Sequence, residues 1–122
     1  MIVKDIIERL TELLYSGSKE FYYKDHRFEI EEYIYSNPVD FNSYTRISIK
    51  VPVYLSRTFQ DIYSTMYENR PGMEKTEHFL RIEACARLAN EFVTVALLKI
   101  DYELKKERHN RKIDEILDVL DG

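Results

Sequence analysis

Four side chains with distinct binding chemistry recur along one line of the sequence. Phe79, Asn90 and Asp101 are eleven residues apart, almost three turns of a helix, and Arg108 follows seven residues later. This line would offer an aromatic ring, an amide, a carboxylate and a guanidinium. Taken singly, Phe79 belongs in a core, Asn90 at a helix contact, and the two charged groups in solvent. Together they are typical of a ligand pocket.

A local excess of positive charge lies beside this line. Residues 99–112 contain six Lys or Arg against three acids, although the chain carries a formal net charge of -4. An acidic chain is not expected to bind polymeric nucleic acid, because the attraction increases with the number of phosphates that Lys and Arg neutralise. A small anion is the better ligand. Arg27, Arg46, Arg108 and Arg111 suit paired hydrogen bonds to phosphate, and the pocket favours Arg27, Arg108 and Arg111.

No catalytic set is present, so we do not expect an enzyme. The three glycines are too far apart for a phosphate-binding loop, and the three histidines fit no metal spacing. Glu83, Glu91 and Asp101 could hold magnesium, as acids do in the all-helical nucleotide pyrophosphohydrolases. However, Glu91 falls about 80° from the other two on a helical wheel, and paired glutamates one turn apart are absent. We expect no metal and no cofactor.

The single cysteine and the N-terminus indicate the compartment. Cys85 stands alone, which excludes disulfides within the chain, and its apolar helical surroundings make it a poor nucleophile. The N-terminal MIVKDIIERL carries acids and lacks the apolar centre of a signal peptide. No stretch reaches the roughly 18 apolar residues that a membrane span requires. We therefore expect a cytoplasmic protein.

The first half of the chain predicts one helix and a small antiparallel sheet. Apolar residues recur at helical spacing over residues 2–14, and Gly17 is a plausible stop. Residues 19–36 are rich in aromatic and β-branched side chains, and their interruption at residues 24–26 suits a hairpin turn. Tyr44–Val51 alternates cleanly between apolar and polar side chains, which indicates a half-buried strand.

The strand in residues 26–36 contains a change of pattern. Phe28 and Ile30 share one face, whereas Tyr33 and Tyr35 have the opposite parity. A bulge near Glu31 and Glu32, where one extra residue shifts the alternation, would reconcile them. We expect such a bulge.

The second half predicts helices. Ser56 is a candidate N-cap for an amphipathic helix that ends before Pro71, with Phe59, Ile62, Tyr63, Met66 and Tyr67 on its apolar face. Thr76 is the candidate cap of a longer helix that reaches about Arg108. That helix would measure roughly 50 Å, well beyond the diameter of a domain of this size.

The long helix carries two apolar stripes. One consists of Ile82, Ala86, Ala89, Val93, Ala96 and Ile100, and the other of Leu88, Phe92 and Val95. One stripe suits the sheet of the same chain and the other suits a second helix. Earlier segments of the chain could supply that helix, but so long a rod would extend beyond the sheet and expose Leu and Val. We therefore expect a homodimer formed through these helices.

These elements predict one α+β domain over residues 1–122, with a sheet region at about 19–55 and a helical region at about 56–121. The length of 122 residues, with 44% hydrophobic and 33% charged residues, is ordinary for a single domain.

A short sheet before long helices, Phe79 and Asn90 on the long helix, RFE at 27–29 and KKERHNRK at 105–112 resemble the phage Thoeris anti-defence proteins of the first type. The resemblance implies a dimer, able to assemble further, that sequesters cyclic ADP-ribose signals of TIR-domain enzymes in the infected bacterial cytoplasm without cleaving them. It implies that Phe79 stacks on the adenine, that Asn90 bonds the nucleoside, and that Arg27, Arg108 and Arg111 hold the phosphates. The N-terminal helix departs from that pattern.

The alternative is a small protein-binding inhibitor or scaffold with no small-molecule ligand. The chain has ten tyrosines, which are expected mostly on strand faces and core rims, with a few able to stack on a base. In this alternative, exposed tyrosines and an acidic face meet a host protein.

Overall fold

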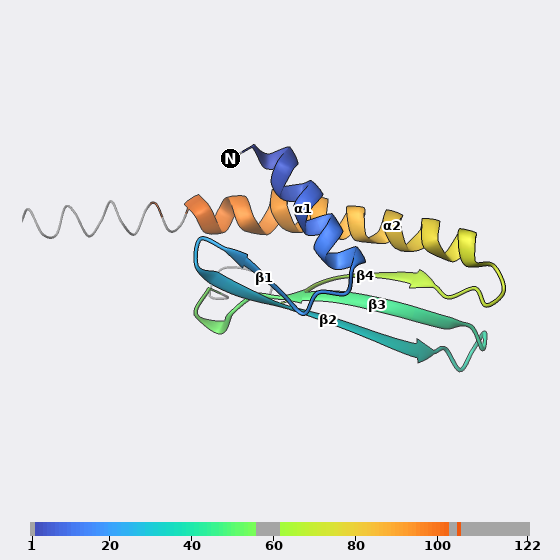
Figure 1. The fold of residues 1–122 in the computed structure, drawn as a ribbon. Coiled ribbons are helices and arrows are strands. Elements are labelled where there is room, and N and C mark those ends of the chain that lie inside the picture. Colours follow the sequence, from blue (N-terminus) through green and yellow to red (C-terminus); the bar gives the residue numbers. More distant parts are fainter. Residues whose placement is uncertain (1, 56–61, 103–104, 106–122) are drawn as a thin grey trace, which may run out of the picture.

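The computed structural model describes residues 2–55, 62–102 and 105 as two helices packed on one face of an antiparallel sheet (Figure 1). In chain order the elements are α1 (Val3–Tyr15), β1 (Glu20–Tyr23), β2 (His26–Ser36), β3 (Ser43–Lys50), the 3-10 turn η1 (Val53–Leu55), β4 (Ile62–Glu68), α2 (Glu74–Glu91) and the π-helical segment η2 (Phe92–Leu97). The strand order is β1-β2-β3-β4. The expected α+β class, with an N-terminal helix and a long C-terminal one, is confirmed.

Helix α1 forms where the apolar spacing predicted it. Ile6, Leu10 and Leu14 are buried on the stripe that faces the core. Gly17 follows the helix with a φ of +79°, in the left-handed region that glycine adopts without a steric penalty. The predicted stop is therefore the residue that turns the chain towards β1.

The predicted hairpin joins β1 to β2. Lys24 and Asp25 both have positive φ, at 47° and 66°, as the central residues of a type I′ turn require. Antiparallel pairing begins at Tyr23 opposite His26 and ends at Glu20 opposite Glu29. Strand β1 is therefore much shorter than its neighbour β2.

The bulge expected near Glu31 and Glu32 is wrong. The pairing of β2 with β3 runs without interruption from Glu29 opposite Lys50 to Ser36 opposite Ser43. Glu32 shares the helix-facing side with Phe28, and it is a polar residue there because it binds a side chain of α2. The side chains of β2 therefore alternate between the two faces without a shift. The apolar pattern changes because Glu32, on the helix-facing side, contacts a charged side chain of α2.

The amphipathic helix expected in residues 56–70 is also wrong, because residues 62–68 form strand β4 against β3. Tyr63 and Tyr67 face the core, four residues apart. That spacing is one helical turn and also two strand periods, so the pattern alone could not separate them. Ser56 and Phe59 of the expected helix lie outside the described residues.

The long helix runs from Glu74 to at least Tyr102, about 43 Å at 1.5 Å per residue. Its N-cap is Met73, so the prediction of Thr76 as the cap is wrong. The ring of Phe92 packs edge-on against Phe28 at 5.3 Å and Tyr63 at 5.4 Å between centroids. The buried side of the helix consists of Ala84, Cys85, Leu88, Ala89, Phe92, Val93, Ala96, Leu97 and Ile100.

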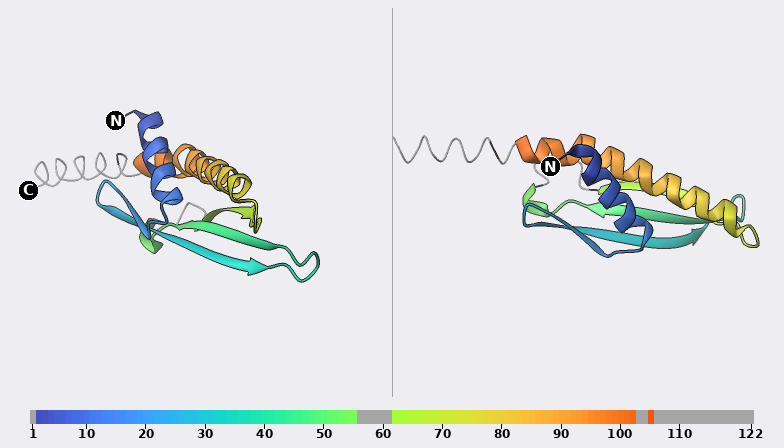
Figure 2. Two further views of the ribbon diagram at one scale, coloured as in Figure 1. Left: turned by 45° about the vertical axis from the view of Figure 1, so that its right-hand side comes forward. Right: turned by 45° about the horizontal axis from the view of Figure 1, so that its top comes forward.

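Helix α1 is the second helix that the apolar stripes called for. It crosses the long helix on the same side of the sheet, as the two views in Figure 2 show. Ile82 and Val95, which the stripes included, are exposed. Over residues 74–102, α1 and the sheet cover the buried side of the long helix and leave these two apolar side chains in solvent. The homodimer through these helices stays a prediction.

Arg81 of α2 ties three other elements together. Its Nη2 donates to the carbonyl oxygens of Leu14 at 3.3 Å and Tyr15 at 2.8 Å, in the last turn of α1, where the helix has no further N–H groups of its own to offer them. Its Nη1 donates to Glu32 at 2.5 Å and to the hydroxyl of Tyr67 at 2.9 Å. Burial opposes the charge, but the hydrogen bonds to Glu32 and Tyr67 outweigh it and raise the pKa of Arg81.

Replacing Arg81 by Met should destabilise the fold by about 3 kcal/mol, because the Glu32 carboxylate and the end of α1 lose their shared donor in a half-buried site. Equilibrium urea unfolding measures this change. Arg70→Met is the matched control, since Arg70 pairs with Glu68 at 3.2 Å on the surface. The control should cost less than about 1 kcal/mol. Equal losses in the two variants would contradict the role given to Arg81.

Cys85 offers a probe of the core. Burial raises the pKa of its thiol from 9.0 to about 11, and the side chain is fully buried. Alkylation at pH 8 should therefore be much slower in the folded protein than in urea, because the thiolate is both scarce and inaccessible. The raised pKa also means that stability is full below pH 9.0 and falls as the pH rises towards about 11. Rapid alkylation under native conditions would contradict this packing.

Candidate functional site

The three predicted ligand-binding residues that the structure describes do not lie together. Phe79 is 66% exposed near the start of α2, and Asn90 is exposed about 16 Å further along the same helix. Arg27 lies on the side of β2 that faces away from both helices, since the next residue, Phe28, is buried against them. Arg108 and Arg111 lie outside the described residues. Of the three described residues, Phe79 and Asn90 are exposed on one helix, and Arg27 lies on the opposite side of the sheet.

Arg27 is already engaged within the sheet. Its Nε donates to Glu20 at 2.6 Å, and its Nη1 donates to Glu29 at 3.2 Å. The hydrogen bond to Glu20, with the negative charges of both glutamates, raises the pKa of Arg27. A phosphate would have to displace two carboxylates to reach this guanidinium.

A hollow of about 580 Å³ lies between α1, β1 and the end of the long helix. Its polar rim includes Asp5, Arg9, Lys24, Asp101 and Lys105. Asp101 forms ion pairs with Lys24 and with Lys105, whose Nζ lies 3.3 Å from the Asp101 carboxylate. The hydrogen bond from Lys24 is the main reason that the pKa of Asp101 is lowered. The two carboxylates of this rim, Asp5 and Asp101, offset two of its three cations, which leaves a net charge of only +1 for a pyrophosphate.

Within the described part of the chain, no three His, Cys, Asp or Glu side chains gather as a metal site would require. Glu83, Glu91 and Asp101 are included in that finding. Among residues 2–55, 62–102 and 105, no helix has the length and apolarity needed to cross a membrane.

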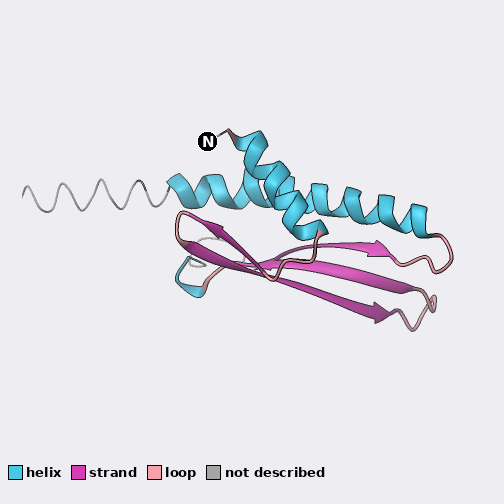
Figure 3. Cartoon of the chain, in the orientation of Figure 1, coloured by secondary structure: helices cyan, strands magenta, loops and turns pink. Residues whose placement is uncertain are grey.

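The outer face of the sheet, opposite the helices, is the other large surface. Figure 3 shows α1 and the long helix above the strands, while the short turn η1 lies below their left end. The register places Tyr33, Arg46 and Met66 in one row across β2, β3 and β4, and Tyr35 and Tyr44 in the next row. We call these five residues the tyrosine patch.

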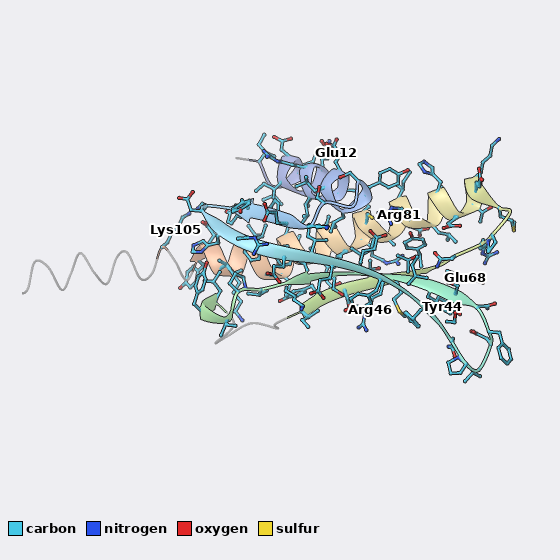
Figure 4. The ribbon with its side chains drawn as sticks, turned by 60° about the horizontal axis from the view of Figure 1, so that its bottom comes forward. Glu12, Tyr44, Arg46, Glu68, Arg81 and Lys105 are labelled. Atoms are coloured by element: carbon cyan, nitrogen blue, oxygen red, sulfur yellow. The ribbon has the colours of Figure 1, made fainter. Side chains whose placement is uncertain are left out.

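The side chains of the tyrosine patch contact one another. The rings of Tyr35 and Tyr44 stack with centroids 5.8 Å apart and planes 26° apart. The hydroxyl of Tyr35 donates to the sulfur of Met66 at 2.5 Å, and Nη2 of Arg46 donates to Oγ of Ser64 at 3.2 Å. Figure 4 shows Tyr44 and Arg46 along this face. The patch is an ordered, partly apolar surface with tyrosine and arginine groups that can still meet a partner.

Tyr44 is held in place by Asp40 in the loop after β2. The tyrosine hydroxyl donates to Oδ2 of Asp40 at 2.8 Å. The backbone N–H of Asn42 and then this hydroxyl lower the pKa of Asp40, while the bond to Asp40 raises the pKa of Tyr44. Tyr44 therefore keeps its proton and a fixed orientation at neutral pH.

Ion pairs neutralise the surroundings of the patch. Lys50 pairs with Glu31 at 2.7 Å, and Arg70 pairs with Glu68 at 3.2 Å. Among the described residues of the outer face, Arg46 is the cation without a carboxylate partner. One guanidinium that is not paired with a carboxylate, among aromatic and Met side chains, is typical of the centre of a protein interface. A nucleic acid strand needs a track of cations beside its stacking rings, which this face does not provide.

The sequence contained part of this site. The alternation of β3 placed Arg46 and Tyr44 on its polar face, and the tyrosines were expected on strand faces. Met66 and Ser64 were missed because residues 56–70 were assigned to a helix. Reading Ile62, Ser64, Met66 and Glu68 as one face of a strand would have completed the patch.

We compared the chain with models of known protein families, with curated proteins and with solved structures, and no match was found in any of the three comparisons.

Proposed function

We propose that the protein works by binding another protein through the tyrosine patch, without catalysis. The observation that carries this proposal is the outer sheet face, on which three tyrosines, a methionine and an arginine lie together, and the described residues give that arginine no carboxylate partner. Tyr, Met and Arg are the residue types enriched at protein interfaces, where large rigid rings bury area at a low cost in conformational entropy.

The chemistry of the patch defines the partner surface. Burying Arg46 without compensation is unfavourable, so the partner must place a carboxylate or several carbonyl oxygens opposite this guanidinium. Around that contact, Tyr33 and Met66, which are about half exposed, call for apolar side chains. The partner is therefore a protein with an acidic group set in an apolar surface.

Sequestration of a cyclic ADP-ribose isomer in an infected bacterial host stays a prediction. It requires Phe79, Asn90 and Arg27, with Arg108 and Arg111, to line one cleft. No feature of the described residues favours that cleft over the tyrosine patch, since Phe79 and Asn90 are on the helix and Arg27 is on the opposite side of the sheet.

A photoreactive amino acid at Tyr33 should crosslink to the partner in cells, whereas the same group at Val53, an exposed residue of η1, should not. Binding of the purified partner is then measured by calorimetry. Arg46→Ala and Tyr33→Ala should each weaken it by about 2 kcal/mol, roughly thirtyfold in Kd, because both lie at the centre of the contact. Val53→Ala should leave the Kd unchanged.

Two results would contradict the proposal. One is a partner that binds the Arg46→Ala and Tyr33→Ala variants as tightly as the unmodified protein. The other is calorimetric binding of a cyclic ADP-ribose isomer that Phe79→Ala abolishes and Arg46→Ala does not, since this would transfer the function to the helix.

A further inference from the structure

Half of β2 lies at an edge of the sheet with no neighbouring strand on one side. Strand β1 pairs with His26 to Glu29, and the N–H of Ile30 donates to the carbonyl oxygen of Lys19 at 2.9 Å. Beyond that point, none of the described residues pairs with this side of β2. Figure 1 shows β1 beside only the first part of β2, with the part towards the arrowhead uncovered. We call residues 31–36 the free edge of β2.

The backbone groups on the free edge follow from the pairing. Because N–H and C=O groups alternate in direction along a strand, the residues with the same parity as Ile30 present theirs to the uncovered side. These residues are Glu32, Ile34 and Ser36. The side chain of Ile34 is 70% exposed, although it lies on the helix-facing side of the sheet. The free edge therefore combines open hydrogen-bonding groups with an exposed apolar side chain.

The devices that usually protect a sheet edge are absent or neutralised here. The free edge has no bulge and no proline, since the register is continuous and Pro38 follows the strand. Its two acids are paired within the chain, Glu31 with Lys50 at 2.7 Å and Glu32 with Arg81 at 2.5 Å. An edge of this length without free charge is a template for another strand.

We propose that the free edge of β2 pairs in antiparallel fashion with the free edge of a second copy of the chain, across a two-fold axis at Ile34. In this register Ile34 faces Ile34 of the second copy, and Glu32 faces Ser36. Each such pair exchanges two backbone hydrogen bonds, so all the open groups of the edge are used. The two four-stranded sheets become one continuous sheet.

The alternative registers are less favourable. Centring the pair on Glu32 would place two acids opposite each other, which is unfavourable. Centring it on Tyr33 would oppose Ser36 to Ile30, whose N–H is already bonded to Lys19. The Ile34-centred register avoids both problems, and it pairs Tyr33 with Tyr35 of the second copy on the outer face. The tyrosine patches of the two copies then adjoin.

A hollow beside the free edge and the exposed β2–β3 loop also favour a second copy of the chain as the partner. A hollow of about 820 Å³ beside the free edge is lined by the Gly17–Lys19 segment and by Ile30 to Ile34, where β1 would have continued. In the antiparallel arrangement the β2–β3 loop of the second copy is carried towards this segment. That loop holds Val39 and Phe41, each 86% exposed. The second copy would thus cover apolar side chains that the single chain leaves in solvent.

Sedimentation of the full-length chain tests the proposal. The unmodified protein should form a dimer at micromolar concentration. Ile34→Lys and Ile34→Glu should each raise the dimer dissociation constant by more than about tenfold, because like charges then meet on the axis. An equimolar mixture of the two variants should recover the dimer, since opposite charges now face each other at position 34.

Val53→Lys and Val53→Glu are the matched controls, because Val53 is at least as exposed to solvent as Ile34 but lies in η1, away from the free edge. They should dimerise like the unmodified protein, and thermal unfolding should show that all four variants fold. A monomeric unmodified protein, or charge variants at Ile34 that still dimerise, would overturn the proposal. A mixture that stays monomeric would overturn the Ile34-centred register. None of these outcomes depends on whether the tyrosine patch binds another protein.

Discussion

The arrangement of this protein depends on the guanidinium of Arg81. It lies where α1 ends, where β2 leaves its short neighbour β1, and where β4 passes beneath α2. With only 16% of its side chain exposed, it must keep every donor occupied, and the Glu32 carboxylate, the Tyr67 hydroxyl and the last carbonyl groups of α1 do so. This one side chain therefore fixes the position of both helices on the sheet.

Fixing the helices on one side determines which surfaces stay open. Because α1 and the sheet together cover the buried side of the long helix, the two surfaces to which we assign recognition lie on the sheet. They are the tyrosine patch on its outer face and the free edge of β2. The ion pair between Arg81 and Glu32 also affects the free edge of β2. It neutralises the negative charge of Glu32, which would otherwise protect this edge from pairing with another strand.

The elements that could be predicted from the sequence are those with an unambiguous period or turn. Residues 2–14 had a clear helical stripe, Lys24 and Asp25 occupied a hairpin turn, and Tyr44–Val51 alternated strictly. Strand β4 could not be predicted, because Tyr63 and Tyr67 fit both periods and only pairing with β3 decides between them.

The candidate site was harder still to predict, because it is assembled across three strands. Glu32 disrupts the apolar pattern of β2 for a reason located in Arg81, far away in the sequence. The stacked pair of Tyr35 and Tyr44 depends on a register that sequence spacing does not contain. For Phe79 and Asn90 the sequence spacing did predict one helix correctly. Their side chains nevertheless face solvent and line no cleft among the described residues.

The central claim is that this protein recognises its partners with its sheet and not with its long helix. Methyl NMR spectra recorded at high and at low protein concentration test it most directly. The signals of Ile34 should shift with concentration, while those of Ile82 and Val95 on the exposed side of the helix should not. Concentration-dependent shifts at Ile82 and Val95, with Ile34 unchanged, would contradict the claim.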